Sequence, residues 1–355
     1  MGALFFWALI SIWLTPAPEI TPEADEIAMT VTEEPLRSES LEELVRSFDE
    51  LGPINSMLIA QHGELLVESY YGRMNAVRAN NIKSASKSIL SLLTGIAIEK
   101  GYLEGLDQPI GEFFPEYFGP NPDPAKEAIT IEDLLTMRSG LASTSRANYG
   151  RWVVSNNWIR YALDRPMSGV PGVDRAYSTG NTHLLGVIIA RASKMNLKQF
   201  AERYLFDPMD IRVYGWDRDP QGYYFGGNNL ALRPVDMVKI GYLMMNLGEW
   251  EGEQLLSGEW IIRSIEPVTG RRTGIDDYGY LWFRRMAGGQ HMIYAFGNGG
   301  QYIMILPELD AVITVTTRNE TNEATRNYRG ELFRQIDREI VPRLGGDRFT
   351  VDIHR

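Results

Sequence analysis

The stretch from residue 292 to residue 317, MIYAFGNGGQYIMILPELDAVITVTT, decides the fold class of this 355-residue chain. It contains three apolar runs, Met292–Phe296, Tyr302–Leu306 and Ala311–Thr317. Their enrichment in β-branched and aromatic residues predicts strands. The Asn-Gly pair between the first two runs favours a turn that sends the chain back on itself. We therefore expect the end of the folded chain to form part of an antiparallel sheet.

The rest of the chain adds strands at both ends and helices between them. The runs Ser56–Gln61 and Glu64–Tyr71 enclose His62-Gly63 and indicate a hairpin, and Tyr278–Arg284 is predicted to be a further strand. Apolar periodicity predicts helices at Leu41–Leu51, Ser84–Lys100, Ile131–Met137, Asn157–Ala162, Thr182–Ser193, Leu197–Tyr204, Pro234–Leu247, Ser257–Ile265 and Glu331–Leu344. Because the terminal strands must pair across this helical middle, the sequence predicts an α+β fold. We expect an antiparallel sheet flanked by helices, with an inserted α-rich domain.

The expected organisation has five segments. They are a signal-like or anchor-like apolar segment at 1–17, an acidic disordered spacer at 18–40, a sheet domain at 41–106 plus 235–345, a helical insertion domain at 107–234, and a tail at 346–355. The apolar run 3–14 is shorter than the roughly 20 residues of a membrane-spanning helix and fits the core of a secretory signal. We expect an exported protein, periplasmic or extracellular, in preference to a cytoplasmic one. A protein tethered to the membrane through its N-terminus is the alternative to a cleaved and released one.

The charge and the residue types missing from the chain exclude several classes of function. The formal net charge is −11, from 46 acidic and 35 basic residues, and residues 16–43 contribute −8 of it through nine acids and one base. An acidic chain is not expected to bind nucleic acid. The absence of cysteine removes thiolate zinc sites, disulfides, cysteine nucleophiles and a lipoprotein anchor. The four histidines are scattered, and no Gly-x-Ser-x-Gly occurs, so we expect no metal, no cofactor and no elbow-type hydrolase.

The segment Ser84-Ala85-Ser86-Lys87 is the first candidate for chemistry. At the start of a helix, a spacing of three residues puts the serine and the lysine on one face. A serine hydroxyl needs a base, and a buried lysine with a populated neutral form can be that base. The helix N-terminus would also stabilise negative charge on Ser84 Oγ. A capping serine followed by a surface lysine is the simpler structural alternative.

Two more segments could complete such a site. Tyr177, in the segment 177–181 (YSTGN), could present its hydroxyl to the serine–lysine pair, and a nearby lysine cation would lower the phenol pKa. The glycines in 297–301 (GNGGQ) allow another segment or a ligand to approach closely. An N–H group of that strand could join the N–H of Ser84 as an oxyanion hole. A half-buried tyrosine and an ordinary turn are the structural alternatives.

The order of these three segments resembles that of the serine β-lactamase and penicillin-binding-protein-like hydrolases. The likeness is narrower to class C β-lactamases, β-lactamase-like esterases and 6-aminohexanoate-dimer hydrolases, and it runs from about residue 51 to residue 344. The segment 129–141 (ITIEDLLTMRSGL) is similar to the family pattern TI-x-x-LL-x-x-x-SGL. Pro171-Gly172 before the tyrosine, 278–282 (YGYLW) and the Gly-Gly-Gln before Tyr302 also fit. The resemblance implies a β-lactamase/transpeptidase-like fold.

The resemblance also implies a role for individual residues. Ser84 matches the acylated nucleophile, Lys87 its proton acceptor, and Tyr177 the residue that protonates the leaving group and later activates water. The backbone N–H groups of Ser84 and Gln301 would form the oxyanion hole. The function implied is a serine hydrolase that opens an ester or amide bond of a small substrate through an acyl-enzyme. A β-lactamase or D,D-carboxypeptidase, and a penicillin-recognising sensor or pseudoenzyme, are the alternatives.

Departures from the family pattern bear on the substrate. The third motif, Asn298-Gly299-Gly300, is expected to contact substrate but lacks the lysine that holds a carboxylate in the family. This loss suits an ester or a linear amide better than a β-lactam or a peptide. In the second motif Thr179 stands where the family has asparagine, and we expect Asn181 to take over its hydrogen bonds. Tyr149 and Trp158, in the helical insertion, are expected to line the substrate pocket.

Overall fold

The computed structural model describes residues 41, 43–46, 48, 52–120, 123–268, 276–318 and 323–345, with backbone only for 323–327. All of them belong to one compact unit that spans residues 36–355. The predicted apolar segment 1–17, spacer 18–40 and tail 346–355 lie outside the described residues. Among the residues described, we find no helix with the length and apolar character needed to cross a membrane.

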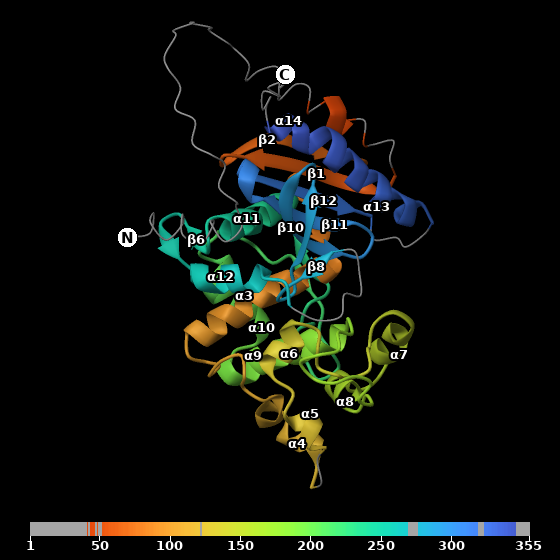
Figure 1. Cartoon of the computed structure of the whole chain (residues 1–355), viewed down its shortest axis with the longest axis vertical. Helices are drawn as coiled ribbons and strands as arrows, with labels where there is room; N and C mark the ends of the chain where they lie inside the picture. The colour runs from red at the N-terminus through yellow and green to blue at the C-terminus, as the bar shows by residue number, and fades with distance from the viewer. Residues whose placement is uncertain are drawn as a thin grey trace, which may run out of the picture. The chain divides into compact units, whose positions relative to one another are not determined.

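A seven-stranded sheet forms the centre of the unit (Figure 1). Its order is β2-β1-β12-β11-β10-β9-β8, and every neighbouring pair is antiparallel. The strands are β1 Ile54–Gln61, β2 Glu64–Tyr70, β8 Asp277–Tyr278, β9 Phe283–Ala287, β10 Gln290–Gly297, β11 Gln301–Leu306 and β12 Ala311–Thr317. The first hairpin therefore pairs with the last strand, as the sequence predicted. The α+β fold with an antiparallel sheet is confirmed.

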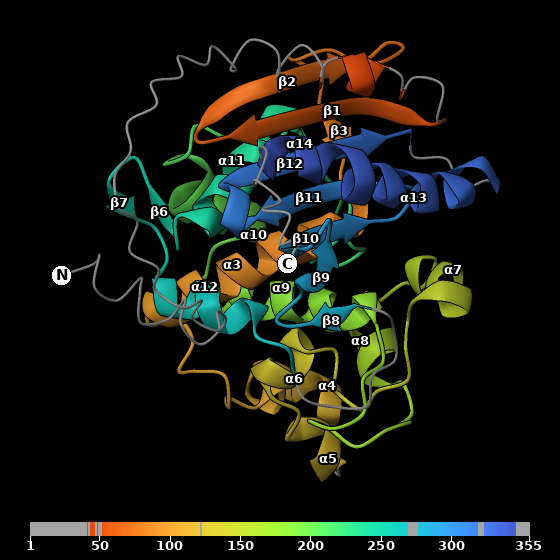
Figure 2. The same ribbon diagram turned by 45° about the horizontal axis from the view of Figure 1, so that its top comes forward.

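Alternating side chains of the sheet feed two hydrophobic cores, because successive residues of a strand point to opposite faces. In β11, Tyr302, Met304 and Leu306 enter one core, whereas Ile303 and Ile305 enter the other. The first core is closed by Leu41, Val45 and Phe48 and by the helices α13 (Glu323–Gln335) and α14 (Val341–Gly345). Figure 2 shows α13 and α14 lying across this face of the sheet. The apolar periodicity of these first and last described segments is therefore explained by their common packing on one face of the sheet.

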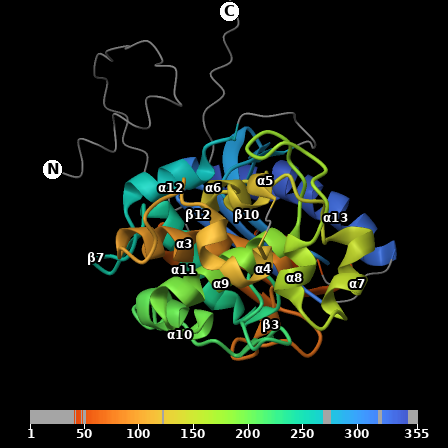
Figure 3. The ribbon, with the colours of Figure 1, turned by 90° about the horizontal axis from the view of Figure 1, so that it is seen from below.

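The second face of the sheet carries the helices that position the site. They are α3 (Ser86–Glu99), α11 (Pro234–Met245) and α12 (Gly258–Ile265). Beyond them lie α4 Pro115–Phe118, α5 Pro124–Glu127, α6 Ile131–Leu135, α7 Tyr149–Val153, α8 Trp158–Leu163, α9 Thr179–Ser193 and α10 Leu197–Ala201, which continues as a π-helical turn over Glu202–Phe206 (Figure 3). One continuous hydrophobic core joins α3 and α9 to the sheet. The division into a sheet domain and an insertion at 107–234 stays a prediction.

One predicted strand and the end of one predicted helix differ from the structure for local backbone reasons. The strand predicted at Tyr278–Arg284 is wrong, because the chain turns between β8 and β9: Gly279 N–H donates to the Trp282 carbonyl, and Leu281 has φ +64°. The helix predicted to reach Met137 ends at Leu135, since Met137 itself adopts φ +59°. A left-handed residue cannot continue a right-handed helix.

Candidate active site

Ser84 is held between a short sheet and the start of α3. Strand β3 (Asn80–Asn81) pairs with β5 (Leu230–Leu232), and Ile82 N–H extends the pairing by donating to the Leu230 carbonyl. Lys83 has φ +51° and its N–H donates to Asn81 Oδ1 over 2.9 Å. Ser84 then lies in a 3₁₀ turn, Lys83–Ala85, and α3 begins only at Ser86. The serine therefore precedes the helix predicted to include it.

Lys87 lies in the first turn of α3 and faces Ser84. Its side chain is 2% exposed, and its Nζ lies 3.1 Å from Ser84 Oγ and 2.7 Å from the carbonyl oxygen of Gly227. Burial lowers the pKa of Lys87 from 10.5 to about 7, because a low-dielectric site disfavours the charged form. A large fraction of the lysine is therefore a neutral amine at neutral pH. The shared face predicted for Ser84 and Lys87 is confirmed by this contact.

Tyr177 completes the cluster from the loop before α9. Its ring centroid lies 5.4 Å from Lys87 Nζ, and its phenol interacts with the Ser84 side chain. Burial raises the pKa of Tyr177 above its ordinary value, although the hydrogen bond to Ser84 and the charges of Arg175 and Arg146 oppose the rise. The expected lowering of this pKa by a lysine cation is wrong, because desolvation outweighs the favourable charges. Tyr177 is therefore a neutral phenol, able to donate a proton.

The carbonyl partner of Lys87 was not predicted from the sequence. Gly227 has φ +74°, and a Cβ there would lie 2.6 Å from Lys87 Cγ and 2.7 Å from Thr182 Oγ1. Its neighbour Gly226 packs on α9, where a Cβ would lie 2.3 Å from the Thr182 carbonyl oxygen. Neither position has room for a side chain. The pair of glycines just before β5 was the sequence signal for such a close approach.

The third motif lies at the end of the β10–β11 hairpin, against the Ser84 turn. A Cβ on Gly297 would lie 2.1 Å from the Ile82 carbonyl oxygen, so glycine permits this contact. The close approach predicted for these glycines is confirmed at Gly297. Gly299 and Gly300 have φ +89° and +113°, and Asn298 is exposed. The contact of the motif with substrate stays a prediction.

Gln301 has a structural contact that the sequence did not indicate. Its Oε1 accepts from Asn80 Nδ2 at 2.8 Å and from Thr317 N at 3.0 Å, and its Nε2 donates to Thr317 Oγ1 at 2.7 Å. The side chain therefore ties β11 to β12 and to the strand that leads into Ser84. This network fixes the backbone of Gln301 beside the nucleophile turn. The oxyanion role of its N–H stays a prediction.

The second motif uses its polar side chains to hold a neighbouring loop. Thr179 Oγ1 lies 3.0 Å from Ser145 Oγ, and Asn181 Oδ1 accepts from Ser139 Oγ at 3.2 Å. Asn181 is 2% exposed, and its Nδ2 has no hydrogen-bond partner within the described part of the chain. The amide therefore retains a free donor next to the tyrosine loop. Its replacement of the family asparagine stays a prediction.

The two predicted pocket residues have different surroundings. Tyr149 is half-buried and accepts a 2.9 Å hydrogen bond from Asn228 Nδ2, next to Gly227. Trp158 is buried among aromatic rings, and its indole N–H donates to the Val153 carbonyl. Both its ring and its indole N–H are in contact inside the protein, and its place in the substrate pocket stays a prediction. Tyr149 remains a candidate for the pocket wall.

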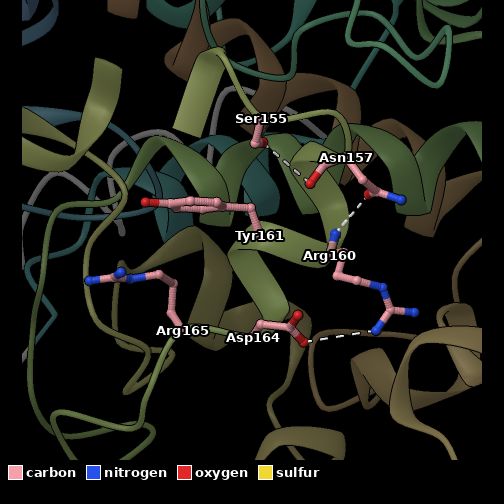
Figure 4. Close-up of a pocket in the computed structure, with 6 residues that line it drawn as sticks. All are labelled: Ser155, Asn157, Arg160, Tyr161, Asp164 and Arg165. Carbon is pink, nitrogen blue, oxygen red and sulfur yellow. Dashed lines mark hydrogen bonds and ion pairs between the residues drawn. The ribbon is translucent and has the colours of Figure 1, made fainter. Parts of the chain in front are cut away.

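A separate hollow of about 340 Å³ lies on the surface beside α8 (Figure 4). Its lining residues are Ser155, Asn157, Arg160, Tyr161, Asp164 and Arg165. None of them belongs to the serine–lysine–tyrosine cluster, and Arg160 is 3.9 Å from the Asp164 carboxylate. We assign no chemistry to this hollow. Within the described ranges, no cluster of three or more histidine or acidic side chains is arranged to hold a metal.

Comparison with known proteins places the chain in a family. The model of the Beta-lactamase family matches residues 44–336, so the chain belongs to that family. Among curated relatives, the 6-aminohexanoate-dimer hydrolase of Paenarthrobacter ureafaciens is 22% identical over 300 residues, which cover 78% of this chain and 75% of that protein. Esterase EstB of Burkholderia gladioli is 23% identical over 209 residues, or 52% of this chain and 53% of that protein. These matches support a β-lactamase-related serine hydrolase.

Solved structures agree on the fold. The octameric penicillin-binding protein homologue from Pyrococcus abyssi has a TM-score of 0.63 at 21% identity, covering 86% of this chain and 78% of that chain. EstCE1, described as a hydrolase with promiscuous acyltransferase activity, has a TM-score of 0.68 at 16% identity, covering 84% and 98%. At these identities the likeness concerns the fold alone. It confirms the β-lactamase/transpeptidase-like architecture.

Proposed function

We propose that this protein hydrolyses an ester or a linear amide of a small substrate through an acyl-enzyme on Ser84. The observation that carries the proposal is the contact of Ser84 Oγ with Lys87 Nζ at 3.1 Å, combined with a pKa of about 7 for that lysine. A serine becomes a nucleophile only when a base takes its proton, and the ideal base has a pKa near the working pH. Lys87 meets both conditions without a metal ligand or a histidine.

In the acylation step, Ser84 Oγ attacks the substrate carbonyl and its proton passes to the neutral amine of Lys87. The carbonyl oxygen becomes an oxyanion, for which the N–H groups of Ser84 and Gln301 are the proposed donors. The C–O or C–N bond then breaks, and the phenol of Tyr177 gives its proton to the departing alcohol or amine. Tyr177 regains a proton from the Lys87 ammonium. The position of the Tyr177 ring, 5.4 Å from Lys87 Nζ, and the interaction of its phenol with Ser84 support this relay.

Deacylation reverses these roles with water in place of the alcohol or amine. Water loses a proton to the Tyr177–Lys87 pair as its oxygen attacks the acyl carbon. The ester bond to Ser84 breaks, and Ser84 Oγ recovers a proton from the same pair. One water molecule has then been added across the substrate bond, and the cluster returns to its starting protonation.

The neutral third motif supports an ester or a linear amide. Asn298 is exposed and uncharged where the family pattern has a lysine that holds a carboxylate. The names of two relatives, an esterase and a 6-aminohexanoate-dimer hydrolase, agree with this preference. A β-lactamase or D,D-carboxypeptidase is the alternative within the same chemistry. A sensor would form the same acyl-enzyme but would not release it.

We also propose that the protein is exported. The proposal rests on the apolar run at 3–14 and the acidic segment behind it. Fractionation of the producing cell, followed by N-terminal sequencing, tests it. Recovery of full-length protein from the cytoplasm alone would refute export.

Ser84→Ala is the direct test of the proposed chemistry. With a p-nitrophenyl ester as substrate, this variant should lose turnover, because no other hydroxyl contacts the lysine in the described structure. Ser91→Ala is the matched control, since Ser91 is a buried serine of the same helix whose Oγ has no hydrogen-bond partner among the described residues. It should keep the wild-type rate. Turnover by Ser84→Ala would refute the mechanism.

A further inference from the structure

A histidine–aspartate pair is buried behind Lys87 and takes no part in the proposed proton transfers. His183 Nε2 lies 2.9 Å from Asp219 Oδ2, and both side chains are fully buried. The rings of Trp152, Trp158 and Phe225 surround the imidazole, with centroids 5.4 to 5.9 Å away. An apolar core gains little from such a polar pair unless the pair organises something else.

The hydrogen bonds of this pair define which nitrogen of His183 carries the proton. The Gly226 N–H donates to His183 Nδ1 over 3.4 Å, and a backbone N–H can only donate. His183 Nδ1 is therefore unprotonated, and the ring proton lies on Nε2, facing Asp219. The other carboxylate oxygen, Oδ1, accepts from Tyr223 N at 2.8 Å. Asp219 thus fixes the tautomer that makes His183 an acceptor for Gly226.

The residue after Gly226 is the one that contacts Lys87. Gly227 offers its carbonyl oxygen to Lys87 Nζ at 2.7 Å, while Ser84 Oγ lies 3.1 Å from the same nitrogen. A neutral amine that donates one N–H to Gly227 can turn its lone pair toward the serine hydroxyl. The carbonyl of Gly227 therefore decides where the base of the reaction points. His183 holds the N–H of Gly226, and the chain runs from there through Gly226 and Gly227 to this carbonyl. A shift of the Gly226 amide would therefore also displace the Gly227 carbonyl.

We propose that the buried His183–Asp219 pair is a positioning device, which holds the Gly226–Gly227 backbone so that Lys87 directs its lone pair at Ser84. The inference rests on the proposed function, because it gives Lys87 the role of base. It assigns His183 and Asp219 no contact with substrate. Their effect is expected in kcat, with little change in KM.

Asp219→Asn tests the device by reversing the tautomer. The Tyr223 N–H still donates to the side-chain oxygen of the new asparagine. The NH₂ group of that asparagine must therefore face His183 Nε2. That nitrogen becomes the acceptor and the ring proton moves to Nδ1, where it meets the Gly226 N–H. Two donors then face each other, and the backbone at Gly226 is pushed away. A displacement on the order of 1 Å at a catalytic group can cost about 100-fold in rate.

The measurement combines ¹⁵N NMR of the histidine rings with steady-state kinetics on a p-nitrophenyl ester. The chain has four histidines, so the His183 signals can be assigned by single substitutions. We expect the Nε2–H tautomer in the wild type and the Nδ1–H tautomer in Asp219→Asn, with kcat lowered about 10- to 100-fold. The matched control is Asp217→Asn, in the same loop, whose carboxylate bonds Asn229 instead. It should leave the His183 tautomer and kcat unchanged.

Two His183 variants provide the same test if Asp219→Asn does not fold. In His183→Asn, the side-chain oxygen can take the place of Nδ1 and accept from the Gly226 N–H. In His183→Gln, the side-chain NH₂ can take the place of Nε2 and donate to Asp219, but no acceptor is left for Gly226. We expect His183→Asn to keep kcat closer to the wild type than His183→Gln. Equal losses in the two variants, or a reversed tautomer with full kcat, would overturn the proposal. Failure of the proposed function is distinguishable, because Ser84→Ala would then turn over substrate whatever the tautomer.

Discussion

Replacing Lys87 by methionine should make the protein inactive and, near neutral pH, more stable. The wild type must bury an amine whose pKa falls from 10.5 to about 7 on folding. The difference of 3.5, at about 1.36 kcal/mol for each pH unit, corresponds to about 5 kcal/mol of destabilisation when the lysine is charged in both states. Methionine fills a similar volume and carries no charge to desolvate.

The sign of the pH dependence follows from proton uptake. Between pH 7 and pH 10.5 the unfolded lysine is protonated and the folded one is not, so unfolding takes up a proton. The stability of the wild type therefore rises with pH in this window, at about 1.4 kcal/mol per pH unit, relative to Lys87→Met. Below pH 7 the wild type bears the whole destabilisation from burying the charged lysine, and above pH 10.5 this destabilisation is absent. Loss of the bond to Gly227 costs about 1–3 kcal/mol but does not depend on pH.

Urea unfolding at pH 7.5 and pH 9.5 isolates the lysine. The stability difference between Lys87→Met and the wild type should shrink by about 2.7 kcal/mol from the lower pH to the higher, since two pH units separate them. Lys100→Met is the control, because Lys100 is exposed at the end of α3. Its difference from the wild type should be the same at both pH values. A Lys87→Met difference that does not change with pH would refute the low pKa, and with it the role of Lys87 as a base.

Three further outcomes are expected. The specificity constant kcat/KM should rise with pH through about 7, where Lys87 becomes neutral. It should show no decrease at any pH up to 10, because the pKa of Tyr177 is raised. A pH–rate profile of ester hydrolysis checks both expectations. Gly227→Ala should lower kcat about tenfold or more by displacing Lys87, whereas Gly222→Ala, at φ +89° with no atom within 4 Å of its Cβ, should share the backbone strain but keep kcat. Asn298→Lys should raise kcat/KM for a β-lactam that carries a carboxylate and leave a neutral ester unchanged, as parallel kinetics on the two substrates would reveal.

The sequence was sufficient for most of the sheet and for the contact between Ser84 and Lys87. Strands such as Ala311–Thr317 are predictable because β-branched residues and alternating faces are local properties. The contact of Ser84 with Lys87 is also local, since residues three apart lie on one side of a 3₁₀ turn that continues into a helix. Both predictions concern residues close in the chain, where few conformations compete.

The rest of the site depends on contacts between distant residues. Gly227 lies 140 residues from the lysine it contacts, and His183 lies 36 residues from Asp219. No spacing rule connects such partners. The pKa of Tyr177 was predicted with the wrong sign because charge neighbours can be guessed from a motif, whereas the depth of burial cannot.

The central claim is that Ser84 becomes acylated, and intact-mass spectrometry tests it most directly. The protein is mixed with a short ester, a β-lactam or a linear amide, quenched in acid within one turnover, and digested to locate any added mass. The mechanism predicts an increase equal to the acyl group on the peptide that contains Ser84, and no increase in Ser84→Ala. Turnover of the ester with no adduct, or an adduct on another residue, would contradict it.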